Sequence, residues 1–118
     1  MTADRTEPAA YKISLTIPAD RADELMDAVN GAMQQIYPGY DRVFSLTGTV
    51  GTWRSLEGSD PFIGKAGEIS VEEEVRIDFA VKAEDLKEVI LAVRRVHPYE
   101  EPAIDIMPMI LWKDVIYR

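Results

Sequence analysis

The sequence predicts an α+β domain whose elements run strand, helix, strand, strand, helix, strand. Residues 11–17 and 75–81 alternate apolar and polar side chains, which is the period of a half-buried strand. Residues 22–36 and 86–96 repeat apolar side chains at three- and four-residue steps, which is the period of an amphipathic helix. Right-handed crossovers in this order place both helices on one face of a four-stranded antiparallel sheet. We therefore predict a ferredoxin-like βαββαβ fold with an extra C-terminal edge element.

Length and charge limit the classes of protein to which the chain can belong. A chain of 118 residues suits one domain with a core of its own. The net charge of -8 opposes binding to a phosphate backbone, so we expect no nucleic acid partner. The chain has no cysteine, which excludes disulfides and thiolate metal sites. It also has no apolar run of membrane-spanning length and no signal-peptide pattern, so we expect a cytoplasmic protein without a membrane partner.

The first third of the chain predicts a polar arm, a strand and a helix. Residues 1–10 lack periodicity, and we expect a flexible N-terminal arm before a single domain over residues 11–118. The helix at residues 22–36 has acidic side chains near its positive end and stops at Pro38 and Gly39. Its methionines, Met26 and Met33, stand at helical spacing and are interpreted as core side chains, not as metal ligands.

Residues 42–67 predict a long strand followed by an irregular loop. The strand at residues 42–53 contains Gly48 and Gly51, so we expect it to bend or bulge there and to project beyond the sheet. The loop that follows is rich in glycine yet contains Leu56, Phe62 and Ile63. These apolar side chains either fold back on the sheet or are buried by a neighbouring subunit, and we favour the second. The glycine spacing does not fit a P-loop, which disfavours a phosphate cradle.

The second half of the chain begins with an acidic run, Glu72, Glu73 and Glu74. We interpret this run as the solvated start of the strand at residues 75–81, because successive strand residues point to opposite faces and cannot converge on a metal ion. The helix at residues 86–96 is stopped by Pro98. A strand is predicted at residues 103–107. The apolar tail at residues 109–118 is expected to dock, and an extra edge strand is one way for it to do so.

The link between the second helix and the last strand, residues 97–102, holds the only histidine of the chain. Neutral imidazole is a common metal ligand and Glu100 can add an oxygen donor, so a divalent metal site at His97 and Glu100 is one interpretation. The interpretation that we favour is structural, with His97 bonded to carbonyl groups at the end of the helix. Tyr99 beside Glu100 and Glu101 also suggests acid-base chemistry, but no nucleophile accompanies these residues and we assign no catalytic residue.

Two motifs carry a resemblance to known families. The run His97-Pro98-Tyr99-Glu100-Glu101-Pro102, with the helix before it, resembles the helix-to-strand signature of the CutA divalent-cation-tolerance proteins, which are related in fold to PII signalling proteins. The run GTWRSLEGSDPFIG at residues 51–64 is similar to the PII-like insert domain of YqfO-type proteins, the NGG-interacting-factor group labelled GTP cyclohydrolase type 1-like. The resemblance covers residues 11–108. The chain departs from the insert's pattern at Val50 and at Ser55, which stands where a proline is usual.

The resemblance implies a function class for the chain. It implies a free-standing insert-like domain that forms a non-enzymatic, oligomeric CutA-like or PII-like module for small-ligand or protein interaction. The alternative is a divalent-metal-binding protein that uses His97. A hydrolase inheriting the cyclohydrolase label is less favoured, because the dinuclear metal site of the larger proteins lies in flanking domains with several histidines. The residues that we expect at a ligand site or an interface are Trp53, Arg54, Glu57, Phe62, Tyr99, Glu100, Glu101 and Trp112.

We also expect a homo-oligomer, with a trimer favoured over a dimer. The reason in the sequence is an excess of apolar side chains outside the four-stranded core, in the projecting region and in the C-terminal tail. A chain of this length has few places to bury them. The resemblance to CutA and PII proteins favours three subunits.

Overall fold

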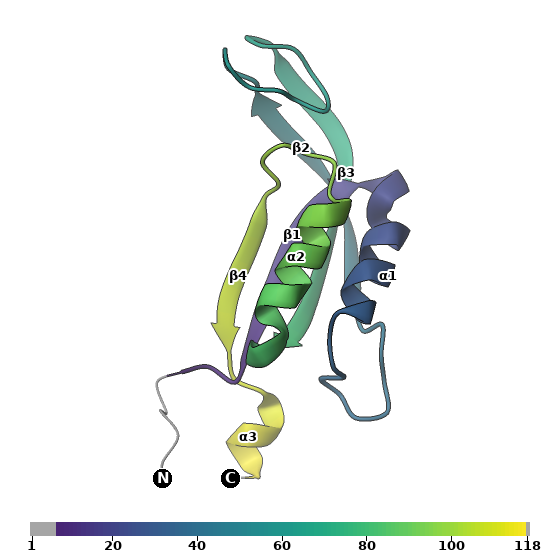
Figure 1. The fold of residues 1–118 in the computed structure, drawn as a ribbon, viewed down its shortest axis with the longest axis vertical. Coiled ribbons are helices and arrows are strands. Elements are labelled where there is room, and N and C mark those ends of the chain that lie inside the picture. The colour runs from purple at the N-terminus through teal and green to yellow at the C-terminus, as the bar shows by residue number, and fades with distance from the viewer. Residues whose placement is uncertain (1–6, 118) are drawn as a thin grey trace.

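The computed structural model describes residues 7–117. Its centre is a four-stranded sheet in the order β2-β3-β1-β4, in which neighbouring strands are antiparallel. The ferredoxin-like prediction is therefore confirmed (Figure 1). The elements are β1 (Ala10–Pro18), α1 (Ala22–Gly31), β2 (Ser45–Arg54), β3 (Ile69–Lys82), α2 (Leu86–Val96), β4 (Ile104–Met109) and α3 (Trp112–Ile116), and single 3-10 turns precede α1 and α2.

The helices α1 and α2 lie side by side on one face of the sheet (Figure 1). Each fully buried aliphatic side chain between the layers contributes about 1.5–3 kcal/mol to folding. The alternating strand residues and the helical stripes predicted from the sequence meet in this core. Its fully buried members are Ile13, Leu15, Ile17, Leu25, Val29, Ile77, Val81, Val89 and Val93.

The opposite face of the sheet carries polar side chains, and no helix of residues 7–117 covers it (Figure 1). Ser14 of β1 pairs with Asp78 of β3, and Thr16 pairs with Arg76, so these four residues share a face. The Arg76 guanidinium donates a hydrogen bond from Nη1 to Ser14 Oγ at 3.2 Å. The polar face predicted from the alternation is confirmed, and it supplies one wall of the site described below.

Strands β2 and β3 continue beyond the rest of the sheet as a projecting hairpin. The last pair between β3 and β1 is Glu74 with Pro18, whereas β3 residues 69–73 pair only with β2. Figure 1 shows this hairpin rising above the helices in a molecule 54 Å long. The prediction of a projecting strand is confirmed. Of the predicted bend or bulge, the bulge is absent, because the pairing register runs without interruption through Gly48 and Gly51.

Two boundaries in the first half differ from the sequence prediction. Helix α1 ends at Gly31 instead of residue 36, and β2 begins at Ser45 instead of residue 42. The backbone N–H of Gln34 donates to Asp85 at 2.9 Å, and that of Arg42 donates to Asn30 at 2.9 Å. The side chains of Asp85 and Asn30 thus accept hydrogen bonds from backbone N–H groups that a longer helix or strand would use for its own hydrogen bonds.

Strand β3 is longer than predicted, since it begins at Ile69 and includes the whole acidic run at residues 72–74. The tail also differs from the prediction, because it forms the short helix α3 in place of an edge strand. Apolar side chains of α3 stay exposed, and Trp112 keeps 55% of its surface. Strand β1 begins at the buried Ala10, and residues 1–6 of the expected flexible arm lie outside the described residues. No helix in residues 7–117 has the length and apolarity needed to cross a membrane.

Candidate functional site

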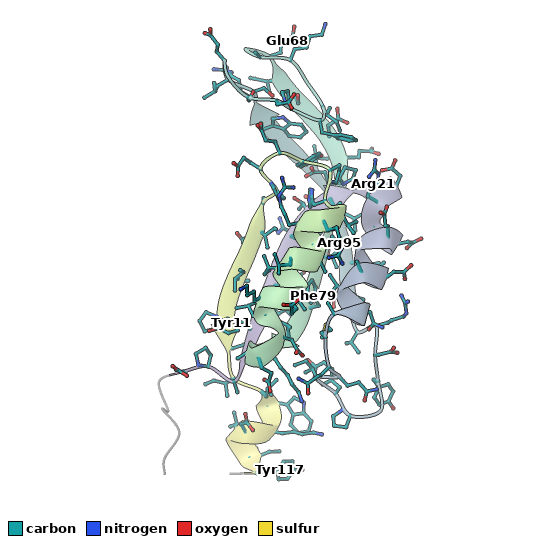
Figure 2. The ribbon with its side chains drawn as sticks, viewed as in Figure 1. Tyr11, Arg21, Glu68, Phe79, Arg95 and Tyr117 are labelled. Atoms are coloured by element: carbon teal, nitrogen blue, oxygen red, sulfur yellow. The ribbon has the colours of Figure 1, made fainter. Side chains whose placement is uncertain are left out.

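A cleft of about 520 Å³ lies where the projecting hairpin meets residues 97–103, which connect α2 to β4 and are called the 97–103 link below. Its base includes Thr16 and Arg76, so it opens on the sheet face that the helices leave uncovered. Figure 2 shows the hairpin above this level, with Glu68 near its tip and Arg21 below its base. Residues that we predicted from two separate motifs line this cleft together: Trp53, Arg54, Phe62, Tyr99, Glu100 and Glu101.

Tyr99 stands at the centre of an aromatic wall in the cleft. Its ring centroid lies 5.4 Å from that of Trp53 on β2. It lies 6.3 Å from that of Phe62 in the hairpin loop, residues 55–68 between β2 and β3. On its other side, the Tyr99 ring lies 5.0 Å from the His97 imidazole. Tilted ring pairs at these separations attract each other through their quadrupoles, beyond the gain from area burial. The aromatic wall, Trp53, Phe62 and Tyr99, thereby joins three segments that are distant in the sequence.

Glu74 is a functional candidate that the sequence interpretation missed. We expected Glu74 to be solvated, but only 6% of its surface is exposed. Its Oε2 accepts a hydrogen bond from the Tyr99 hydroxyl at 2.7 Å. Glu74 faces the same side of the hairpin as Thr49, its partner on β2. The absence of a side chain on Gly51 leaves the space that the Glu74 carboxylate occupies, since a Cβ at that position would overlap it. The alternation of β3 extended backward through Arg76 and Glu74 was the signal that could have found this residue.

The electrostatics of the cleft keep Tyr99 protonated. Burial raises the pKa of Tyr99 well above its ordinary value of 10, and the hydrogen bond to the Glu74 carboxylate raises it further. At neutral pH the phenol therefore acts as a hydrogen-bond donor, and the Glu74 carboxylate accepts that hydrogen bond. This hydrogen bond fixes the position of the Glu74 carboxylate.

His97 is buried under the cleft, and both of its ring nitrogens contact the backbone. Nε2 lies 2.7 Å from the Thr16 carbonyl oxygen, and Nδ1 accepts a hydrogen bond from the Tyr99 N–H at 3.2 Å. Because a carbonyl can only accept and an amide N–H can only donate, the ring is the tautomer protonated on Nε2. Burial lowers the pKa of His97 from 6.5, which favours this neutral ring. His97 thus makes structural contacts, as in the interpretation that we favoured, but its carbonyl partner is Thr16 of β1 and not a carbonyl group at the end of the helix.

The metal interpretation requires a free imidazole nitrogen, and this arrangement offers none. Glu100 is likewise engaged, because its Oε1 accepts a hydrogen bond from the Asp60 N–H at 2.9 Å. Within residues 7–117 no group of three or more histidine, aspartate or glutamate side chains is placed to hold a metal ion. His97 and Glu100 do not fit a metal ion in this geometry. Their contacts instead fasten the 97–103 link to β1 and to the hairpin loop.

Two of the predicted residues lie away from the cleft. Glu57 is exposed in the hairpin loop and does not line the cleft. Trp112 belongs to α3, at the opposite end of the molecule from the hairpin (Figure 1), where it packs on Tyr117 with ring centroids 6.3 Å apart. The structure thus gathers most of the predicted site residues and separates Trp112 from them.

Comparison with known proteins gives relatives in sequence and in fold. No family model matches the chain. The chain is 34% identical over 108 residues to a Halalkalibacterium halodurans protein named GTP cyclohydrolase 1 type 2 homolog, a match that covers 91% of this chain and 29% of the relative. A Bacillus subtilis protein with the same name is 31% identical over 98 residues, which are 83% of this chain and 26% of that protein. The chain therefore spans less than a third of the length of these relatives.

The solved structures agree with the sequence match. A Bacillus cereus protein related to NIF3 superposes with a TM-score of 0.74 and 28% identity, covering 86% of this chain and 26% of that one. CutA1 from Shewanella sp. SIB1 superposes with a TM-score of 0.67 and 18% identity over 94% of this chain and 92% of that one, which shows a shared fold. The chain is thus similar to one segment of the proteins named GTP cyclohydrolase 1 type 2 homolog, and it has a CutA-like fold.

Proposed function

We propose that this chain is a non-enzymatic CutA-like and PII-like module that binds a small ligand in the cleft. The observation that carries the proposal is the convergence of β2, the hairpin loop and the 97–103 link around one volume of about 520 Å³. A concave, partly aromatic surface with a few convergent polar groups is the usual form of a small-molecule site. The aromatic wall supplies the apolar surface, and Glu74 supplies a positioned polar group.

The protonation states of Tyr99 and His97 favour binding over catalysis. The phenol of Tyr99 is held protonated, and the imidazole of His97 is held neutral by two backbone contacts. A general acid or base must exchange its proton near neutral pH, and the environments of Tyr99 and His97 oppose such an exchange. The cyclohydrolase name belongs to relatives of which this chain spans less than a third, so their activity does not transfer with the match.

Nuclear magnetic resonance of the two tryptophan indoles tests the proposal. The chain has two tryptophans, one in the cleft and one in α3, so a Trp112→Phe variant assigns both indole N–H resonances. We expect hits from a small-molecule fragment library to shift the Trp53 resonance and leave the Trp112 resonance in place. Phe62→Ala removes part of the aromatic wall but keeps the Trp53 resonance, and it should weaken this binding, whereas Trp112→Ala should preserve it. A library without hits, or with hits only at Trp112, contradicts the proposed site.

The module is further proposed to act as a homo-oligomer, with a trimer favoured over a dimer. Strands β2 and β4 are the outer strands of the sheet, and an exposed outer strand offers unpaired backbone groups to another chain. At roughly 25 cal/mol per Å² of apolar area, covering several of their side chains offsets an association cost of about 4–15 kcal/mol. The exposed apolar side chains on these two strands are Leu46, Val50, Ile106 and Met107.

Binding of a divalent cation is the second candidate function, because some fold neighbours are named divalent cation tolerance proteins. In this chain the role would require His97 to release Thr16 or Tyr99. The metal content of protein purified without chelator, measured for the wild type and for His97→Ala, tests it. Stoichiometric metal that disappears with His97 supports this second candidate.

A further inference from the structure

The most buried charge in the cleft is negative. Glu74 contributes a carboxylate of which Oε2 is bonded to Tyr99, and no positively charged side chain in the described part of the chain pairs with it. Arg76 lies on the same face of β3, but its guanidinium is directed to Ser14 on β1. A carboxylate held in a partly apolar setting is stabilised by a positive charge that approaches it.

The aromatic wall beside Glu74 also favours positive charge. The face of an aromatic ring attracts a cation that lies within about 6 Å of the ring centroid. Phe62 already shows this property, because the guanidinium carbon of Arg21 lies 5.6 Å from its centroid. Trp53, the strongest type of ring for this interaction, lines the same cleft.

The rim of the cleft agrees with its interior. Glu100 and Glu101 line it, so three carboxylates face the volume together with two guanidinium groups, those of Arg54 and Arg76. Arg54, Glu100 and Glu101 are all exposed to solvent and therefore screened. Arg76 is bonded to Ser14, so the buried carboxylate of Glu74 is the charge that a ligand meets with the least screening. The charge of the whole chain, -8, has the same sign as the interior of the cleft.

We infer that the ligand of this cleft is an organic cation, with an ammonium or guanidinium group carried on a small apolar body. The inference rests on the proposed function and specifies its ligand class. The cationic group contacts the Glu74 carboxylate, and the apolar body lies against Trp53 and Tyr99. Both a free alkyl amine or guanidine and an arginine or lysine side chain of a peptide have this chemistry.

Matched probes separate the charge from the shape of the ligand. Butylguanidinium, its neutral analogue butylurea and the anion butanoate are titrated separately into the labelled protein while the Trp53 indole resonance is followed. We expect butylguanidinium to bind about tenfold more tightly than butylurea, which corresponds to one charge-assisted hydrogen bond. The blocked peptide acetyl-Gly-Arg-Gly-amide is the fourth probe. A peptide that binds more tightly than butylguanidinium identifies a protein side chain as the source, and a weaker peptide identifies a free small cation.

Two neighbouring glutamates provide the variant and its control. Glu74→Gln removes the charge in the cleft but keeps an oxygen for the Tyr99 hydroxyl, whereas Glu73→Gln removes an exposed charge on the opposite face of β3. We expect Glu74→Gln to weaken butylguanidinium binding about tenfold and Glu73→Gln to change it less than about twofold. Thermal melting of both variants checks that they are folded.

The outcomes distinguish this inference from the proposed function. Butylurea or butanoate binding at Trp53 as tightly as butylguanidinium overturns the cationic ligand and leaves the cleft as a binding site. An unchanged affinity in Glu74→Gln does the same. Fragment-library hits at Trp53 without any binding of butylguanidinium also overturn only the cationic ligand. If no probe and no fragment shifts the Trp53 resonance, both the cationic ligand and the proposed binding function are overturned.

Discussion

The Tyr99 hydroxyl donates a hydrogen bond to Glu74 Oε2 across 2.7 Å, although 25 residues separate the two in the sequence. Through its backbone N–H, the same tyrosine bonds to His97, whose ring reaches the Thr16 carbonyl on β1. A continuous set of hydrogen bonds thus runs from β1 through the 97–103 link to β3. The shape of the cleft depends on this set.

Replacing Tyr99 by phenylalanine removes one bond of the set and leaves the ring in place. Because Glu74 then loses its hydrogen-bond donor in a buried position, we expect the free energy of unfolding to fall by about 1–3 kcal/mol. Urea denaturation measures this change. Tyr40→Phe is the matched control, since Tyr40 is 69% exposed, and we expect it to change stability by less than about 0.5 kcal/mol. Equal effects of the two variants contradict the role given to the Tyr99 hydroxyl.

The stability of the protein should depend on pH through His97. The folded state lowers the pKa of His97 below its unfolded value of about 6.5, so the neutral ring is favoured by folding. This contribution is present above about pH 6.5 and is lost as the pH falls below that value. Denaturation of the wild type and of His97→Gln between pH 7.5 and 5 measures it, because the chain has one histidine. A difference between the two proteins that stays constant over this range contradicts the prediction.

Two glycines of β2 differ in what surrounds them. A Cβ on Gly51 would overlap the Glu74 carboxylate, whereas a Cβ on Gly48 would meet no atom within 4 Å. We expect Gly51→Ala to lower the free energy of unfolding by about 1–3 kcal/mol and to displace Glu74. Gly48→Ala should be neutral or stabilising by up to about 1 kcal/mol, because it reduces the entropy of the unfolded chain. A Gly51→Ala variant as stable as Gly48→Ala would refute the close approach of the Glu74 carboxylate to Gly51.

The proposed assembly predicts a mass of three chains in light scattering at micromolar concentration. Trp112 is exposed in α3, and a charged side chain there disfavours any interface that covers this helix. We therefore expect Trp112→Glu to shift the mass downward, and Glu88→Gln, an exposed change in α2, to leave it unchanged. A monomeric wild type contradicts the assembly. A dimeric wild type retains an interface and rules out the trimer.

The fold was predictable where local burial determines the pattern. Ile13, Leu15 and Ile77 alternate with polar residues because one face of the sheet is buried by helices, and that pattern is visible in the sequence. The end of α1 at Gly31 was not predictable, because the chain is drawn away by the bond of Gln34 to Asp85, 51 residues further on. The tail was misjudged for a related reason, since apolar composition does not say which element will cover Trp112.

The site was predictable in part. The two motifs supplied Trp53, Phe62 and Tyr99, and the structure brings them together. Glu74 was missed because three consecutive glutamates look alike in the sequence. The alternation of β3 separates Glu74 from Glu73, but it does not separate Glu74 from Glu72, and the folding of the 97–103 link over Glu74 is visible only in the structure.

Crystallographic fragment soaking tests most directly whether the cleft is the functional site. We predict that bound fragments gather between Trp53, Tyr99 and Glu74, and that they do so repeatedly across chemically different fragments. Gathering of the fragments at the smaller pocket beside Asn30 and Arg42, or an even scatter over the surface, would contradict the account.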